Sequence, residues 1–135
     1  MNKKIFIIED DMNTCSALTA KFSLLGFKVV SFVDEQILVI NNKIKSFQPD
    51  YIVLDLVLPR VNGFDLLSAI KADDQLAKIP VFIFADLSSK NDKERATNLG
   101  ADYLFSKEKF TLDEFIERTE KIISNSDKIK KLNKL

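Results

Sequence analysis

Five short apolar runs alternate with segments of helical periodicity, and this alternation constrains the fold more than any other feature of the sequence. The runs are rich in Ile, Val, Leu and Phe and cover residues 3–9, 27–33, 51–57, 81–85 and 101–105. Uninterrupted apolar runs of this length are typical of strands that are buried on both faces. Strands that alternate with helices form a parallel sheet covered by helices on both sides. We therefore predict one three-layer αβα domain of the α/β class, built on a five-stranded parallel sheet.

The segments between the runs carry the signals of helices. Apolar residues recur at helical spacing in four of them, at Leu18, Phe22 and Leu25; at Ile37, Ile40, Ile44 and Phe47; at Leu66, Leu67 and Ile70; and at Ala96 and Leu99. Gly26 and Gly100 stand where left-handed helix ends are expected. N-terminal caps are expected at Asp11, at Ser88 or Ser89, and at Thr111, which forms a capping box with Glu114. The last helix is expected to bury Leu112, Phe115, Thr119 and Ile122.

The composition excludes several classes of function. The chain has 135 residues, with 20 basic and 20 acidic side chains, no histidine and one cysteine, Cys15. The absence of histidine excludes serine–histidine and cysteine–histidine catalysis and histidine metal sites. The balanced charge gives no indication of nucleic-acid or membrane binding. No apolar run approaches the roughly 18 residues of a membrane span, and the N-terminus lacks the features of a signal peptide, so a cytoplasmic protein is expected.

The C-terminal segment, residues 125–135, is basic and reads "NSDKIKKLNKL". Ile129, Leu132 and Leu135 lie three residues apart in it, which favours an extension of the last helix. A linker and a frayed end are also compatible with the pattern. We therefore assign residues 1–124 to the domain and residues 125–135 to a basic tail or helix extension.

Acidic residues follow two of the predicted strands. Glu9 and Asp10 end the first run, Asp55 lies near the end of the third, and Lys107 follows the fifth. Open parallel sheets bind ligands at the carboxyl ends of their strands, where the strand order reverses. In the order 2-1-3-4-5 the first and third strands are neighbours at that point. This order would bring the three carboxylates together, with the lysine on the far side.

Such a cluster needs a cation, because clustered carboxylates raise one another's pKa. Mg²⁺ suits it, since this ion prefers oxygen ligands and is commonly held by one or two carboxylates together with a phosphate. The lysine can reach a phosphoryl oxygen as a mobile charge, and a carboxylate is the natural acceptor of a phosphoryl group where no histidine exists. Taken alone, each residue also has a plainer interpretation as a cap, a turn residue or a surface side chain, and we keep that interpretation for Asp11.

Four blocks of the sequence, "IFIIEDD", "IVLDLVLPRVNGFDLL", "IPVFIFA" and "LGADYLFSKEKF", resemble the receiver (CheY-like) domain of bacterial two-component response regulators. The resemblance covers roughly residues 3–124 and implies a flavodoxin-like fold. It implies that Asp55 is the phosphoacceptor and that Lys107 contacts the phosphoryl group. It also implies a Mg²⁺ or Mn²⁺ ion held by Glu9, Asp10, Asp55 and the backbone carbonyl of Val57.

The same resemblance implies a signalling domain rather than an enzyme, although such a domain takes part in its own phosphoryl transfer and hydrolysis. The phosphoryl donor would be a sensor histidine kinase or a histidine phosphotransfer protein. The signal would pass to a downstream effector protein or a fused output domain. A homodimer is compatible with the sequence, and no direct contact of this domain with nucleic acid or membrane is expected.

Three positions depart from the family pattern. Ala85 stands where the family usually has Ser or Thr, whose hydroxyl binds the phosphoryl group, and Leu104 stands where an aromatic side chain usually moves inward. Glu108 replaces the proline that commonly follows the lysine. Phe105 does not replace the missing aromatic, because neighbouring residues of a strand point to opposite faces.

These departures favour one alternative, a pseudo-receiver that serves as an interaction module without phosphorylation-driven switching. An aspartyl-phosphate phosphatase is less suitable, because it normally has a second acid two residues after the nucleophile. Val57 stands at that position and cannot donate a proton. A dinucleotide-binding domain would need a glycine-rich loop after the first strand, where the sequence reads "EDDMNT".

Overall fold

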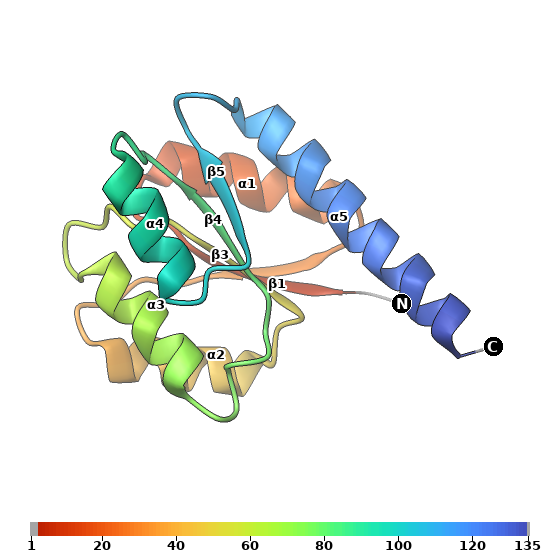
Figure 1. Ribbon diagram of the computed structural model, residues 1–135, viewed down its shortest axis with the longest axis horizontal. Coiled ribbons are helices and arrows are strands. Elements are labelled where there is room, and N and C mark those ends of the chain that lie inside the picture. The colour runs from red at the N-terminus through yellow and green to blue at the C-terminus, as the bar shows by residue number, and fades with distance from the viewer. Residues whose placement is uncertain (1–2, 135) are drawn as a thin grey trace.

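The computed structural model describes residues 3–134 and consists of a five-stranded parallel sheet between two layers of helices (Figure 1). The strands are β1 (Lys4–Ile8), β2 (Lys28–Ser31), β3 (Tyr51–Leu54), β4 (Val81–Ala85) and β5 (Tyr103–Ser106). They pair in the order β2-β1-β3-β4-β5, and every pair is parallel. The predicted fold class and strand order are confirmed. Met1, Asn2 and Leu135, which belong to the expected domain and tail, lie outside the described residues.

In the described part of the chain, five helices cover the sheet, namely α1 (Met12–Leu24), α2 (Ile37–Phe47), α3 (Gly63–Ala72), α4 (Lys90–Asn98) and α5 (Leu112–Asn133). The buried apolar side chains form two clusters, one on each face of the sheet. Helices α2, α3 and α4 pack in the first cluster, and α1 and α5 pack in the second. Figure 1 shows the same division of the helices between the two faces.

Neighbouring residues of β4 and β5 face opposite layers. Ala85 and Leu104 belong to the cluster beneath α2, α3 and α4, whereas Phe84 and Phe105 belong to the cluster beneath α1 and α5. Phe84 and Phe105 are also partners in the β4–β5 register. The expectation that Phe105 points away from the face of Leu104 is therefore confirmed.

Most strands are shorter than the apolar runs that predicted them. Only β4 has the predicted limits, and β5 is displaced toward Ser106. Strand β3 ends at Leu54 and not at Val57, so the Asp55 side chain projects from the first position beyond the strand. The Asp55 N–H still donates a hydrogen bond of 3.0 Å to the Ile8 carbonyl, which fixes this position against β1.

The predicted helix caps are largely observed. Asp11 caps α1 by accepting a 2.9 Å bond from the Thr14 N–H, and α5 opens with the predicted capping box. Ser89, not Ser88, caps α4.

The predicted buried residues of α5 are wrong in part. Phe115 and Thr119 are buried as predicted, but Ile116 and Ile123 complete the buried stripe, while Leu112 and Ile122 are half-buried. Leu25 is exposed because it lies at the C-cap of α1, beyond the last helical residue.

Helix α5 continues without a break to Asn133, through most of the segment assigned to a tail or extension. Its last turns extend beyond the sheet (Figure 1). Ile129 and Leu132 are exposed there, and Lys3 pairs with Asp127 at 3.6 Å. Within residues 3–134, no helix has both the length and the apolar character that crossing a membrane requires.

Candidate functional site

Two carboxylates and one lysine meet at the carboxyl edge of the sheet. Glu9 directly follows β1, Asp55 directly follows β3, and Lys107 directly follows β5. The Nζ of Lys107 lies 2.8 Å from Oε1 of Glu9 and 3.2 Å from Oδ2 of Asp55. Glu9 and Asp55 are each only 6% exposed. The strand order therefore assembles a buried acidic pair with a shared cation, as the sequence predicted for these three residues.

Backbone groups hold the three side chains in place. The Val57 N–H donates to Oδ1 of Asp55 at 3.0 Å, and the Asp11 N–H donates to Oε2 of Glu9 at 3.1 Å. The Lys107 N–H donates to the Ala85 carbonyl at 2.9 Å, which anchors the chain after β5 to the end of β4. The loops after β1 and β3 thus orient the carboxylates of Glu9 and Asp55, and the end of β4 fixes the backbone of Lys107.

Gly63, the first residue of α3, lets the helix approach the loop that contains Asp55. A Cβ at this position would lie 2.3 Å from the carbonyl oxygen of Leu56, far inside contact distance. Asn62 caps the same helix by accepting from the Phe64 and Asp65 N–H groups. The α3 N-terminus is therefore closely packed on the backbone directly after Asp55.

The charges at this site are unbalanced. Burial raises the pKa of Asp55 to about 6, with a further increase from the charge of Glu9, against the lowering effects of the Val57 N–H and Lys107. Burial acts to lower the pKa of Lys107, but the hydrogen bond to Glu9 and the charge of Asp55 outweigh it and raise that pKa overall. Lys107 is thus firmly protonated, yet it does not fully compensate the two carboxylates.

Asp10 does not join this group. Its Oδ1 accepts a 3.3 Å bond from Nη2 of Arg60, in the loop after β3. Within residues 3–134 no three acidic, cysteine or histidine side chains lie together in a group that could hold a metal ion. In this conformation the structure therefore brings Glu9 and Asp55 together, while the carboxylate of Asp10 is paired with Arg60.

The donor chemistry nevertheless fits a hard divalent cation. Glu9 and Asp55 supply oxygen ligands, Asp10 is adjacent to Glu9 in the chain, and the two buried carboxylates share the single ammonium of Lys107. Asp10 could reach the pair by leaving Arg60, since its side chain is about one-third exposed. The Val57 side chain has no ligand atom, so this residue can take part in ligand binding through its backbone alone.

The departures from the family pattern lie beside this group. Ala85 is fully buried beneath α2, α3 and α4 and offers no hydroxyl, while the neighbouring Asp86 is exposed. Leu104 is half-buried in the same layer. The Glu108 N–H donates to Oγ of Ser106 at 3.2 Å. The last side chain of β4 on the face toward α4 is therefore a methyl group without a hydroxyl.

Sequence reasoning missed two neighbours of the site. Arg60 stands in the turn "LPRVNG", where nothing in the pattern indicates a partner for Asp10. Phe84 belongs to the apolar run of residues 81–85, which predicts only a core position, but the Nζ of Lys107 lies 5.6 Å from the centroid of its ring. The alternation of faces along a strand places Phe84 on the face opposite Ala85, at the strand end near the lysine. This is only a weak signal of a contact between the ring and Lys107.

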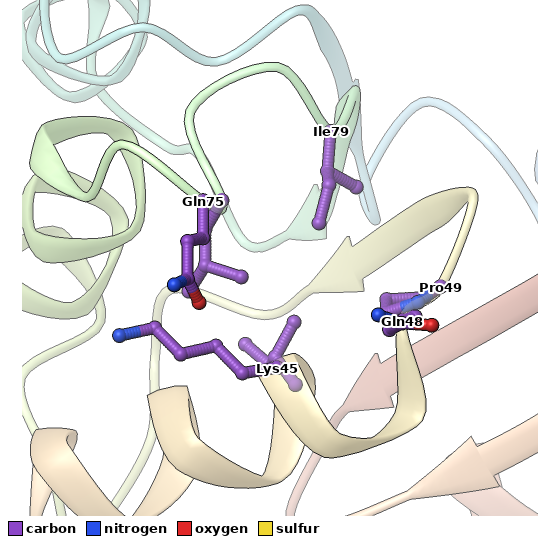
Figure 2. Close-up of a pocket in the computed structure, with 7 residues that line it drawn as sticks. Lys45, Gln48, Pro49, Gln75 and Ile79 are labelled. Carbon is purple, nitrogen blue, oxygen red and sulfur yellow. The ribbon is translucent and has the colours of Figure 1, made fainter.

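A separate pocket lies at the opposite edge of the sheet (Figure 2). It is formed by the end of α2 and by the segments that precede β3 and β4, and its lining includes Lys45, Gln48, Pro49, Gln75 and Ile79. These segments precede their strands, whereas Glu9, Asp55 and Lys107 follow theirs. The pocket is therefore not part of the candidate site.

Comparison with known proteins identifies relatives of the chain. The family model of the response regulator receiver domain matches residues 5–120. The DNA-binding dual master transcriptional regulator RpaA of Synechocystis is 31% identical over 129 residues, which cover 93% of this chain and 51% of the relative. The chain spans about half the length, or less, of the curated relatives it matches.

Solved structures show the same architecture. The N-terminal domain of the nisin resistance regulator NsrR, a lantibiotic response regulator, is 30% identical with a TM-score of 0.74, covering 90% of this chain and 98% of that one. The Mn²⁺-bound form of the response regulator Rcp1, at 21% identity, shares the fold with a TM-score of 0.71, covering 85% of this chain and 88% of that one. The family match extends from β1 into α5, and the chain belongs to the response regulator receiver domain family, the signalling receivers of two-component systems.

Proposed function

We propose that Asp55 accepts a phosphoryl group from a phosphohistidine of a sensor histidine kinase or a histidine phosphotransfer protein. The observation that carries the proposal is the buried Asp55 carboxylate at the end of β3, 3.2 Å from the ammonium of Lys107. This arrangement supplies a nucleophile and, beside it, a cation for the phosphoryl oxygens. With a pKa of about 6, Asp55 is ionised and nucleophilic at neutral pH.

In the proposed transfer a carboxylate oxygen of Asp55 attacks the phosphorus of the phosphohistidine. An O–P bond forms as the N–P bond breaks, and the imidazole nitrogen keeps the electron pair and takes up a proton. Because the Val57 N–H holds Oδ1, we assign the attack to Oδ2, which faces Lys107. Water later hydrolyses the acyl phosphate, which restores the carboxylate and releases inorganic phosphate.

We propose Mg²⁺ or Mn²⁺ as the cofactor, held by the carboxylates of Glu9, Asp10 and Asp55 and by the carbonyl of Val57. A divalent cation bound there would neutralise charge on the transferring phosphoryl group. The all-oxygen donor set and the sharing of one lysine by two buried carboxylates support this assignment. The Mn²⁺-bound form of Rcp1, which shares the fold, supports it as well. Asp10 would exchange Arg60 for the cation.

The signal would pass to a downstream effector protein or to an output domain fused to this chain. The similarity to RpaA, a DNA-binding regulator about twice as long as the matched region, supports a fused output domain. The receiver itself would not contact nucleic acid, since its 20 basic and 20 acidic side chains balance. We place the domain in the cytoplasm, where the phosphorylated histidine of a sensor kinase would reach it, and a homodimer is compatible with this role.

A pseudo-receiver is not favoured as a second function. Ala85 and Leu104 remove two contacts of the usual switch, but both lie on the face beneath α2, α3 and α4. They leave the buried group of Glu9, Asp55 and Lys107 intact. The residues for phosphoryl acceptance therefore follow the family pattern, whereas two residues of the usual switch depart from it.

The test is the binding of beryllofluoride, a mimic of the phosphoryl group, followed by ¹⁹F NMR in the presence of millimolar Mg²⁺. We expect a bound signal for the native chain and none for Asp55→Asn. Asp86→Asn is the matched control, since Asp86 is an exposed acid at the same sheet edge, and it should bind as the native chain does. Absence of bound probe in the native chain, or equal binding by Asp55→Asn, would contradict the proposal.

A further inference from the structure

The usual route from the phosphorylation site of a receiver to its surface lacks two side chains in this protein. Ala85 is a buried methyl group and Leu104 is aliphatic. Phosphorylation of Asp55 can change the protein surface only if some other contact differs between the two states. Lys107 is the candidate for that contact, because its ammonium is shared between Glu9 and Asp55.

The ammonium of Lys107 has an aromatic neighbour as well. Its Nζ lies 5.6 Å from the ring centroid of Phe84, within the range of a cation–π interaction. Phe84 is 4% exposed and lies one residue before Ala85, so it faces the layer of α1 and α5. The ring is thus in contact with the site on one side of the sheet while Ala85 offers nothing on the other.

Phe84 is packed directly on α5. Its ring is stacked on that of Phe115, with the centroids 4.3 Å apart and the planes 6° from parallel. Phe115 is fully buried and also meets Phe105 edge-on at 5.2 Å. Because protein interiors are close-packed, a displacement of one ring is felt by the next. A continuous aromatic contact therefore joins the Lys107 ammonium to α5, the helix that continues to Asn133.

We propose that Phe84 is a positioning residue for Lys107, and that α5 senses the state of Asp55 through the stack of Phe84 on Phe115. This inference rests on the proposed function of Asp55. A phosphoryl group on Asp55 offers the ammonium new oxygen acceptors, so its position over the Phe84 ring changes. The cation at the face of Phe84 is thereby displaced, and the stacked Phe115 and its helix adjust.

The positioning role is tested first, by NMR of the protein without metal or phosphoryl mimic. The ring of Phe84 is expected to shift the Lys107 ε-methylene protons upfield. Phe84→Leu should return them toward the value of a solvated lysine, and Phe82→Leu should not. Phe82 is a matched control because it is a fully buried aromatic residue of β4 on the same face but stacks on Tyr103 at 4.6 Å. Equal shifts in both variants would overturn the positioning role.

The coupling is tested second, with beryllofluoride and Mg²⁺. Bound probe is measured by ¹⁹F NMR, and the response of α5 is measured as the probe-induced chemical-shift change of the methyl groups of Ile116. We expect Phe84→Leu to bind the probe while the shift of Ile116 falls below half of the native value, and Phe82→Leu to keep that shift. An undiminished Ile116 shift in Phe84→Leu would overturn the coupling alone. Failure of the native chain to bind the probe would instead overturn the proposed function of Asp55, and this inference with it.

A second substitution separates electrostatics from packing. Pentafluorophenylalanine at position 84 keeps the shape of the ring, with fluorine atoms slightly larger than hydrogen, but reverses the sign of its quadrupole, so it no longer attracts an ammonium. We expect native circular dichroism. The upfield shift of the Lys107 protons and the probe-induced shift of Ile116 should be lost as in Phe84→Leu. Native signals from this protein would show that the ring acts without attracting Lys107, which contradicts the proposal.

Discussion

Nη2 of Arg60 lies 3.3 Å from Oδ1 of Asp10 and joins the loop after β3 to the end of β1. The residue proposed as a metal ligand therefore already has a cationic partner within the same protein. About half of the Arg60 side chain and one-third of that of Asp10 are exposed, so the pair is screened by water and contributes little to stability. A divalent cation bound by Asp10 would therefore compete with Arg60 for this carboxylate.

Replacement of Arg60 should strengthen metal binding. In Arg60→Gln the Asp10 carboxylate is released and one positive charge leaves the neighbourhood, so we expect Mg²⁺ to bind about two- to five-fold more tightly, as the loss of an exposed ion pair allows. Titration of the amide signals of Glu9, Asp10 and Asp55 with Mg²⁺ measures the affinity. Arg95→Gln is the control, since Arg95 stacks on Phe64 and not on an acid. Equal affinities for Arg60→Gln and the native chain would contradict a competing role for Arg60.

The raised pKa of Asp55 predicts how stability depends on pH in the presence of a chelator. Asp55 titrates at about 6 in the folded chain against 3.8 in the unfolded one, so the folded state binds the proton more tightly and loses stability as pH rises between these values. Asp55→Asn removes this loss. We expect the variant to be more stable than the native chain at pH 7.5, by about 1–3 kcal/mol, and nearly equal to it at pH 4.

Urea unfolding followed by circular dichroism at the two pH values measures this difference. Asp86→Asn serves as the control, because the exposed Asp86 should change stability little at either pH. A variant Asp55→Asn that is less stable than the native chain at pH 7.5 would show that the bond to Lys107 outweighs the cost of burying the charge.

Much of the fold follows from the apolar pattern. The five runs predicted five strands, and Asp11, Thr111 and Glu114 predicted caps that the structure contains. The limits of the strands did not follow from this pattern, because an apolar run can continue after the backbone pairing of the strand has stopped. Val57 illustrates this, since it completes an apolar run but lies beyond β3 and is largely exposed.

The site was predictable only where backbone topology decides it. Glu9, Asp55 and Lys107 come together because parallel strands bring their carboxyl ends to one edge. The orientation of Asp10 depends on side-chain rotation and on Arg60, which lies in a turn without periodicity. The contact of Phe84 with Lys107 requires the face of β4 and the path of the lysine to be known together. The alternation of faces along β4 indicates the first of these, and no local pattern indicates the second.

Gly63 should be intolerant of any side chain. A Cβ there would lie 2.3 Å from the Leu56 carbonyl oxygen, so the α3 N-terminus would have to move away from the backbone that follows Asp55. We expect Gly63→Ala to cost about 1–3 kcal/mol of stability, as overpacking does, and to weaken beryllofluoride binding. Gly26→Ala is an informative comparison, because its Cβ would meet nothing within 4 Å although its φ is +94°. It should lower stability through backbone strain but leave binding of the probe unchanged.

A hydroxyl at position 85 should restore the contact that this chain lacks. Ala85 occupies the strand-end position at which the family usually has Ser or Thr, and its carbonyl already fixes Lys107 through a 2.9 Å bond from the lysine N–H. We expect Ala85→Thr to bind beryllofluoride about three- to ten-fold more tightly than the native chain, as one added hydrogen bond allows.

Ala85→Val is the matched control, since valine has the shape of threonine without the hydroxyl and imposes the same crowding on the buried layer. The ratio of the affinities of the two variants, measured by ¹⁹F NMR, isolates the hydroxyl. A ratio near one would mean that residue 85 does not face the phosphoryl group, and that the loss of the usual hydroxyl has no bearing on how this receiver holds it.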